Sequence, residues 1–152
     1  MPGPLDGVRI VDLTGMLAGP WATMILGDQG ADVIKVEPPG RGDHTRAMGG
    51  QRGGLSTNFL NLNRSKRSLA LDLKCEEGRA VLLDLARGAD VMVQNFRSGV
   101  VDRLGVGEAA VREVRPDIVY VSISGFGERG PFAEKPAYDP VIQAVSGLTS
   151  VQ

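Results

Sequence analysis

Short runs of aliphatic and β-branched residues recur along the chain, with segments of helical spacing between them. The first run, Val8–Leu13 (VRIVDL), is almost continuously apolar, which is typical of a strand buried on both faces of a parallel sheet. The further strands expected are Asp32–Val36, Ser68–Leu73, Asp90–Gln94 and Ile118–Ser122, and the expected helices are Pro20–Leu26, Glu76–Arg87 and Val106–Val114. The alternation predicts an α/β fold, a Rossmann-like parallel sheet with helices on both faces.

One long stretch, Pro38–Arg67, shows no convincing periodicity and far exceeds the usual connection between a strand and a helix. It holds six glycines and a single acid, Asp43. Its cations are Arg41, Arg46, Arg52, Arg64, Lys66 and Arg67. Glycine lets a backbone approach a ligand and arginine pairs with phosphate, so we interpret the stretch as a phosphate-binding loop. A solvated charged face is the alternative.

Composition limits the classes of function. The 152 residues, 42% of them hydrophobic, suffice for one ordinary domain or part of one. A net charge of -1 and a pI near 5.8 argue against a nucleic-acid binder. Cys75 is the single cysteine, which excludes an internal disulfide and a Cys-rich metal site and favours a reducing, cytoplasmic setting. We expect no metal and no membrane-spanning segment.

The turn after the first strand tests for a nicotinamide cofactor. In Thr14–Pro20 (TGMLAGP), only Gly15 and Gly19 are present, so the G-x-G-x-x-G fingerprint of dinucleotide-binding folds is absent and NAD is not expected. Glu37 falls where such folds carry a ribose-binding acid, but an acid beside arginines is more often an ion-pair partner. The residues alone indicate a phosphate-bearing ligand at the carboxyl ends of the strands.

Two single residues are expected to have structural roles, and a third is given none. Cys75 is expected to cap the helix that begins at Glu76, and Asp139 is expected to cap a helix that begins with Pro140. The lone His44 is given no role. The apolar pattern after Pro140 runs to Gln152 without a polar close, so we expect the chain to be the N-terminal part of a larger domain.

Several segments together resemble the class III coenzyme A transferase family, which includes formyl-CoA and carnitine CoA transferases and the α-methylacyl-CoA racemases. They are PLDGVRIVDLTGMLAGPWATMILGDQGADVIKVEPPGRGDHTR, LNRSKRSLALDLK, ADVMVQNFRSGVVDRLG and YVSISGFGERGP. The resemblance implies that residues 1–152 are the N-terminal part of a Rossmann-like domain that binds CoA as a substrate. It also implies a second, smaller domain outside this chain and a homodimer of two chains interlocked like links.

By position, the resemblance implies six residues that contact CoA. They are Met16, Leu71, Lys74, Asn95, Phe96 and Arg103. Leu71 and Lys74 correspond to contacts with the nucleotide end, Arg103 lies near the phosphates, and the other three line the rest of the cofactor. The sequence departs from the family at Pro38, where an arginine is common, and at Leu17, where some transferases use a glutamine near the reacting thioester.

The family's transferases attack the thioester with an aspartate that would fall beyond Gln152, so no catalytic residue is expected in this chain. The resemblance implies an enzyme that moves CoA from an acyl-CoA to a carboxylic acid through an aspartyl-CoA thioester. The alternatives are an α-methylacyl-CoA racemase and a non-catalytic CoA-binding module. Tyr138 favours the transferase, because the racemases carry a histidine base at this position before the aspartate that corresponds to Asp139.

Overall fold

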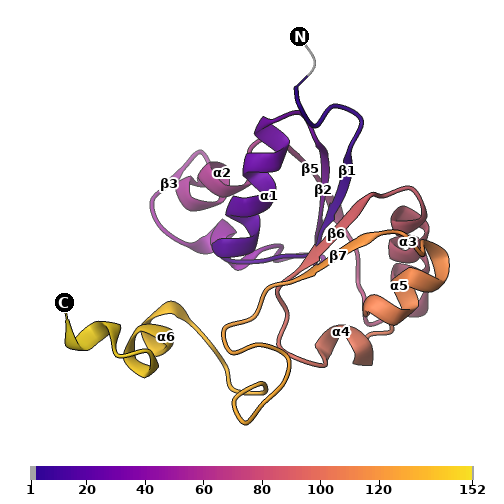
Figure 1. Cartoon of the computed structure of the whole chain (residues 1–152). Helices are drawn as coiled ribbons and strands as arrows, with labels where there is room; N and C mark the ends of the chain where they lie inside the picture. Colours follow the sequence, from indigo (N-terminus) through magenta and orange to yellow (C-terminus); the bar gives the residue numbers. More distant parts are fainter. Residues whose placement is uncertain (1–2, 152) are drawn as a thin grey trace.

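Five parallel strands form the central sheet of the computed structural model, which describes residues 3–151 (Figure 1). Their spatial order is β5-β2-β1-β6-β7. The bounds are Arg9–Asp12 for β1, Asp32–Glu37 for β2, Lys66–Ala70 for β5, Val91–Gln94 for β6 and Val119–Ser122 for β7. The predicted fold class is confirmed. The third predicted strand was placed too late in the sequence, because pairing with β2 begins at Lys66 opposite Val33.

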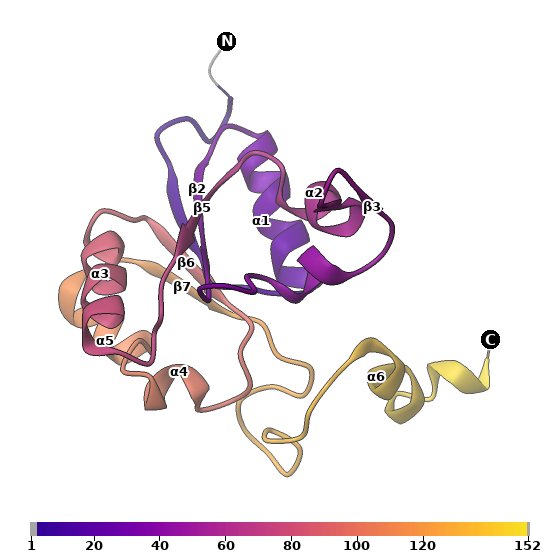
Figure 2. The ribbon, with the colours of Figure 1, turned by 180° about the vertical axis from the view of Figure 1, so that it is seen from behind.

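Helices cover both faces of this sheet. The helices among residues 3–151 are α1 (Ala18–Asp28), α2 (Thr57–Asn63), α3 (Glu76–Arg87), α4 (Val100–Arg103), α5 (Glu108–Val114) and α6 (Asp139–Val145), of which α6 lies away from the sheet. Figures 1 and 2 show α1 and α2 on one face and α3 and α5 on the other. Cys75 caps α3 as predicted, since its Sγ accepts a bond from the Gly78 N–H at 3.4 Å. Among residues 3–151, no helix combines the length and apolar character needed to cross a bilayer.

Alternate residues of each central strand enter two separate cores. Val11 and Met92 pack with Leu82 beneath α3 and α5, whereas Ile10 and Val93 pack toward the other face of the sheet. Each of these five side chains is at most 4% exposed. Burial on both faces explains why the strands read as continuous apolar runs and not as alternating ones.

The stretch Pro38–Arg67 is not an irregular loop, and this expectation was wrong. It folds into the 3-10 turn η1 (His44–Ala47), the hairpin of β3 (Gln51–Arg52) and β4 (Leu55–Ser56), α2, and the first two residues of β5. Polar caps start two of these elements. The Asp43 carboxylate accepts the Thr45 N–H at η1, and the Ser56 hydroxyl accepts the Phe59 N–H at α2. Such short capped elements carry too few residues for a periodic signal.

The C-terminal segment also differs from its prediction. Tyr138, not Asp139, is the N-cap of α6, and the Asp139 carboxylate accepts a bond from the Gln143 side chain inside the helix. The helix ends at Val145, where Gly147 with φ 79° turns the chain into η2 (Leu148–Ser150). Gln152 lies outside the described residues. Figures 1 and 2 show this segment extending away from the sheet.

Candidate functional site at the carboxyl edge of the sheet

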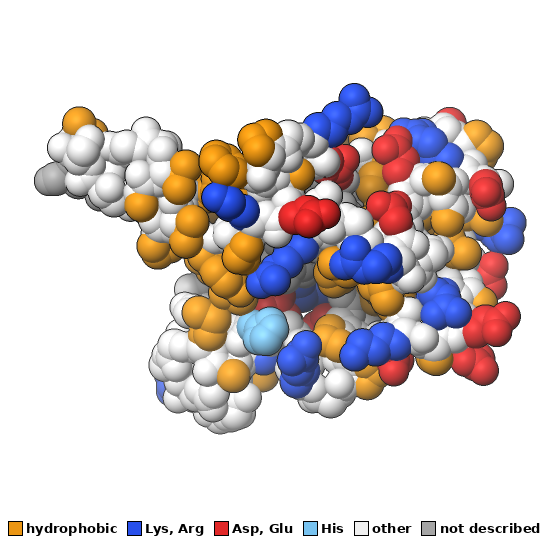
Figure 3. All heavy atoms as spheres, turned by 90° about the horizontal axis from the view of Figure 1, so that it is seen from below, with side chains coloured by type: hydrophobic (Ala, Val, Ile, Leu, Met, Phe, Trp, Pro, Cys, Tyr) orange, Lys and Arg blue, Asp and Glu red, His pale blue; other side chains and the backbone are white. Residues whose placement is uncertain are grey.

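The carboxyl ends of the five parallel strands lie at the lower end of the sheet in Figure 1, above α4 and the loop that follows β7. From β1 the chain moves to β2 and β5 on one side, and β6 and β7 fill the other side. The strand order therefore reverses between β1 and β6, the place where Rossmann-like sheets bind ligands. Figure 3 views this edge and shows Lys and Arg side chains around a hollow, with the histidine at its rim.

Asn95 joins the two turns that flank this switch point. Its side-chain oxygen accepts the Gly15 N–H at 2.9 Å, and its side-chain N–H donates to the Gly15 carbonyl at 2.8 Å. Both hydrogen-bonding groups of one residue in the β1–α1 turn are thereby fixed by the residue that follows β6. The paired contacts also fix the orientation of the Asn95 amide.

The buried carboxylate of Asp12, at the end of β1, also binds the β1–α1 turn. Asp12 is 0% exposed, and its Oδ1 accepts the Thr14 N–H at 2.9 Å. Its Oδ2 accepts from the Thr23 hydroxyl at 2.7 Å and from Lys66 Nζ at 2.9 Å. Lys66 also donates to the Pro20 carbonyl at 2.8 Å and to Asn63. Burial lowers the pKa of Lys66, and the Asp12 carboxylate opposes that shift.

A second buried ion pair lies beside the first. Lys35, 1% exposed, donates from Nζ to the Thr14 carbonyl at 2.7 Å and approaches Asp43 Oδ2 at 2.9 Å. The latter contact is an ion pair between two buried side chains. Asp43 Oδ1 accepts the Thr45 N–H at 2.9 Å and the Met16 N–H at 3.4 Å. Burial would raise the pKa of Asp43, but Thr45 and Lys35 outweigh it and hold this pKa below its usual value.

These contacts enforce an uncommon backbone. Met16 has φ 66°, a left-handed conformation that costs a residue with a side chain about 1 to 2 kcal/mol. Gly19 makes the close approach of α1 possible, because a Cβ there would overlap the Thr14 side chain. Strain of this kind persists where its surroundings determine the conformation, and it clusters at functional sites.

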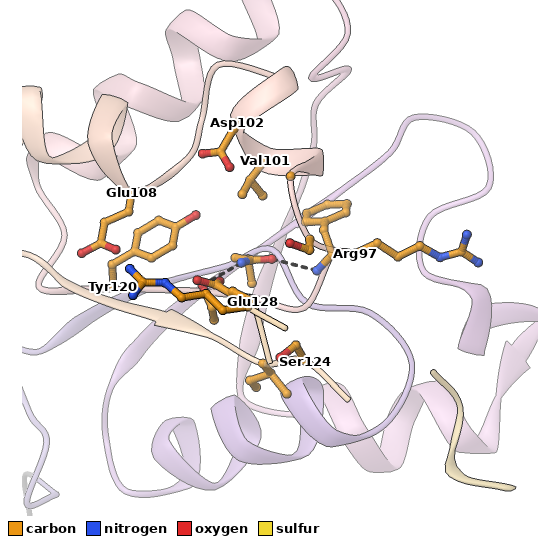
Figure 4. Close-up of a pocket in the computed structure, with 14 residues that line it drawn as sticks. Arg97, Val101, Asp102, Glu108, Tyr120, Ser124 and Glu128 are labelled. Atoms are coloured by element: carbon orange, nitrogen blue, oxygen red, sulfur yellow. Dashed lines mark hydrogen bonds between the residues drawn. The ribbon is translucent and has the colours of Figure 1, made fainter. Parts of the chain in front are cut away.

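Two pockets open between the ends of β6 and β7, with volumes of about 300 and 310 Å³. They share Phe96, Arg97, Ser98, Ile123 and Ser124. Figure 4 shows Asp102, Glu108, Tyr120 and Glu128 around the first pocket, with Arg97 extending away from them. Burial, aided by the three nearby carboxylates, raises the pKa of Tyr120 to about 12, so its phenol stays a hydrogen-bond donor. Ala18, Asn95 and Tyr138 line the second pocket.

The six residues proposed to contact CoA lie on this one edge but on four segments. Met16 and Asn95 lie in the two turns that flank the switch point, and Phe96 lines both pockets. Leu71, Lys74 and Arg103 are more dispersed. Leu71 follows β5 and donates its N–H to the Glu37 carbonyl at 2.9 Å, Lys74 is exposed just before α3, and Arg103 is exposed at the end of α4.

Most of the cations in Pro38–Arg67 have an acidic partner within the protein, which the interpretation of this stretch as a phosphate-binding loop did not foresee. Four of its six cations form ion pairs with acids outside the stretch, at N–O distances of 2.6 to 2.9 Å. The pairs are Arg46–Glu37, Arg64–Asp28, Lys66–Asp12 and Arg67–Asp32. Glu37 is thus an ion-pair partner, as the sequence indicated. Arg41 and Arg52, both exposed, keep their charge available to a ligand.

The buried charges were missed by sequence reasoning, although a signal was present. Asp12 interrupts the apolar run VRIVDL, and Lys35 interrupts VIKVE. A charge inside a strand that is buried on both faces needs a partner, because an unpaired buried charge is very costly. Two such charges in neighbouring strands therefore indicate a polar network at that level of the sheet.

Glu37 makes the acid stability of this edge testable. Burial opposes its ionisation, but Arg46 (two bonds of 2.7 Å), the Asp43 N–H and Ser68 favour the carboxylate, so its pKa lies below the ordinary 4.5. The stability that it contributes is present above about pH 4.5 and lost as pH falls through the lower folded pKa. Urea unfolding between about pH 6 and about pH 3 should show a flatter pH dependence in Glu37→Gln. Parallel curves for the two proteins would contradict this assignment.

The comparison with protein families gives a match over nearly the whole chain. A family model described as CoA-transferase family III matches residues 5–152. Acetyl-CoA:oxalate CoA-transferase of Acetobacter aceti is 49% identical over 146 residues, covering 96% of this chain and 38% of the relative. Human succinyl-CoA:glutarate CoA-transferase is 47% identical over 149 residues, covering 97% of this chain and 34% of the relative.

Solved structures agree with this match. Rv3272 from Mycobacterium tuberculosis superposes with a TM-score of 0.92 at 39% identity, over 99% of this chain and 42% of the other. A CAIB/BAIF family protein from Brucella suis gives a TM-score of 0.91 at 42% identity, over 97% of this chain and 40% of the other. The chain thus spans about two fifths of the length of the proteins that it matches.

Proposed function

Because the chain belongs to CoA-transferase family III, we propose that it forms the CoA-binding part of an enzyme that moves CoA from an acyl-CoA donor to a carboxylic acid acceptor. The match over residues 5–152 carries this proposal. The two relatives named above, at 47 and 49% identity, transfer CoA to a dicarboxylate according to their names. Small dicarboxylic acids are therefore the first acceptors to test.

The proposed reaction consists of four successive substitutions in which one aspartate carboxylate takes part. An aspartate C-terminal to Gln152 attacks the thioester carbonyl. The CoA thiolate departs, and a mixed anhydride of the donor acid and the aspartate is formed. The thiolate then attacks the aspartyl carbonyl, which releases the donor acid and forms the aspartyl-CoA thioester. The acceptor carboxylate attacks this thioester, which expels the thiolate and forms a second mixed anhydride. The thiolate then attacks the acceptor's acyl carbonyl, which gives the new acyl-CoA and the free aspartate.

The chain's own residues would hold CoA during these exchanges. We assign Lys74 and Arg103 to the phosphates, Leu71 to the nucleotide end, and Met16, Asn95 and Phe96 to the part nearest the thioester. Their places after β1, β5 and β6 support the assignment, because ligands of such sheets bind beyond the carboxyl ends. We also propose that the protein acts in the cytoplasm as an interlocked homodimer, as the family resemblance implies.

Binding of CoA to the protein at its natural full length tests this assignment. Lys74→Ala and Arg103→Ala should each weaken CoA binding by about 1.5 to 3 kcal/mol, or roughly 10- to 160-fold, because each removes a charge-assisted contact. The remaining affinity should depend less on salt. Isothermal titration calorimetry at two ionic strengths measures both effects.

Arg87→Ala is the matched control. Arg87 ends α3 at the opposite edge of the sheet and pairs only on the surface with Asp84, at 3.2 Å. Its loss removes the same charge and should leave CoA affinity unchanged. Equal affinities in all three variants would refute the phosphate assignment.

A further inference from the structure

Lys35 is the largest fully buried side chain of the described residues, and the six proposed CoA contacts do not include it. It lies in the middle of β2, where the sequence on either side is apolar. Replacing a buried ion pair with apolar residues is often neutral or stabilising, so stability alone does not account for a lysine there. What Lys35 contacts gives a more specific explanation.

Lys35 is one of three side chains that hold consecutive residues of the β1–α1 turn. Its Nζ donates to the Thr14 carbonyl at 2.7 Å. Asn95 binds both backbone groups of Gly15, and Asp43, held by Lys35, accepts the Met16 N–H at 3.4 Å. The left-handed Met16 follows directly on these contacts. Thus a residue of β2, the residue that follows β6 and the residue before η1 together set the path of the turn.

This path decides where α1 begins. The helix starts two residues after Met16, and Ala18 lines the second pocket together with Asn95 and Phe96. The N-cap Leu17 makes no side-chain capping bond, so the helix start has no local cap and relies on the turn before it. A shift in the turn would therefore move the wall of that pocket.

We propose that Lys35 is a positioning residue: through Thr14 and Asp43 it fixes the Met16 backbone and hence the pocket wall at the start of α1. The effect of Lys35 on catalysis rests on the proposed transferase function. Lys35 touches no ligand in this account. Lys74 and Arg103 lie on other segments, so the nucleotide end of CoA is held independently of the turn.

The test separates positioning from stability. In the full-length protein, Lys35→Met should raise hydrogen exchange at the Gly15 and Met16 amides at least tenfold. It should lower kcat for CoA transfer at least tenfold and change the affinity for 3′-phosphoadenosine 5′-phosphate, a probe of the nucleotide end, less than twofold. Lys35→Met leaves the buried Asp43 carboxylate without its partner. The double variant Lys35→Met/Asp43→Asn removes that charge, so exchange can be measured in it if the single variant unfolds.

Lys66→Met is the control for a buried lysine that pairs with Asp12 and contacts α1 and α2 but makes no bond to Gly15, Met16 or Asp43. It should lower the melting temperature as much as Lys35→Met while the two amides stay protected. Unchanged exchange at Gly15 and Met16 in both Lys35 variants, or an equal loss of protection in Lys66→Met, would overturn the proposal. A wild-type protein that binds no CoA would instead refute the proposed function, and the exchange data would still decide the positioning role.

Discussion

Asp12→Ala is expected to lower the free energy of unfolding by about 3 to 5 kcal/mol, because it leaves a buried ammonium group without its counter-charge. Lys66 would keep only neutral acceptors, the Pro20 carbonyl and the Asn63 amide. Thr14 and Thr23 would also lose their shared acceptor. Urea or guanidinium unfolding, followed by circular dichroism, measures the loss.

Asp84→Ala is the matched control for this prediction. It also removes an aspartate from an ion pair, but its side chain is 75% exposed and its partner Arg87 is 60% exposed. Exposed pairs contribute little, so the change should stay within about 0.5 kcal/mol. Similar losses for the two variants would mean that the charge network at the end of β1 does not stabilise the sheet as its burial indicates.

The second large effect concerns the reaction that the full-length protein catalyses. We expect CoA transfer to a carboxylic acid without exchange of the donor's α-proton. The resemblance implies a histidine base in the racemases where this chain carries Tyr138, which lines the second pocket. A phenol ordinarily ionises near pH 10 and is poorly matched to removing an α-proton at neutral pH. A well-matched general base contributes about 10² to 10⁴ in rate, so exchange should be at least 100-fold slower than transfer.

Periodicity was enough to predict the sheet and its main helix. The bounds of α3 were predicted as found, because an apolar stripe, a capping cysteine and a closing glycine all agree at Glu76–Arg87. The start of β5 was missed for a physical reason. Lys66 and Arg67 are polar, and they enter the strand because Asp12 of β1 and Asp32 of β2 neutralise them. Pairing across strands leaves no local signal.

For the candidate site, too, some features could be predicted from the sequence and others could not. Family resemblance placed Met16, Asn95 and Phe96 after strands, and the structure brings them to the switch point. It could not indicate that Asn95 clamps Gly15, since the two residues are 80 positions apart. Charge counting over Pro38–Arg67 overstated the unpaired positive charge for a related reason. The compensating acids lie elsewhere in the sequence and meet the arginines only in the folded chain.

One experiment on the full-length protein tests the transferase assignment most directly. The protein is incubated in deuterated water with a 2-methylacyl-CoA donor and a small dicarboxylic acid such as oxalate or glutarate, and the thioesters are analysed by mass spectrometry. We predict that the dicarboxylyl-CoA appears with release of the donor acid, while the remaining donor carries no deuterium at its α-carbon. Deuterium at the α-carbon without any dicarboxylyl-CoA would contradict the account and identify the protein as a racemase.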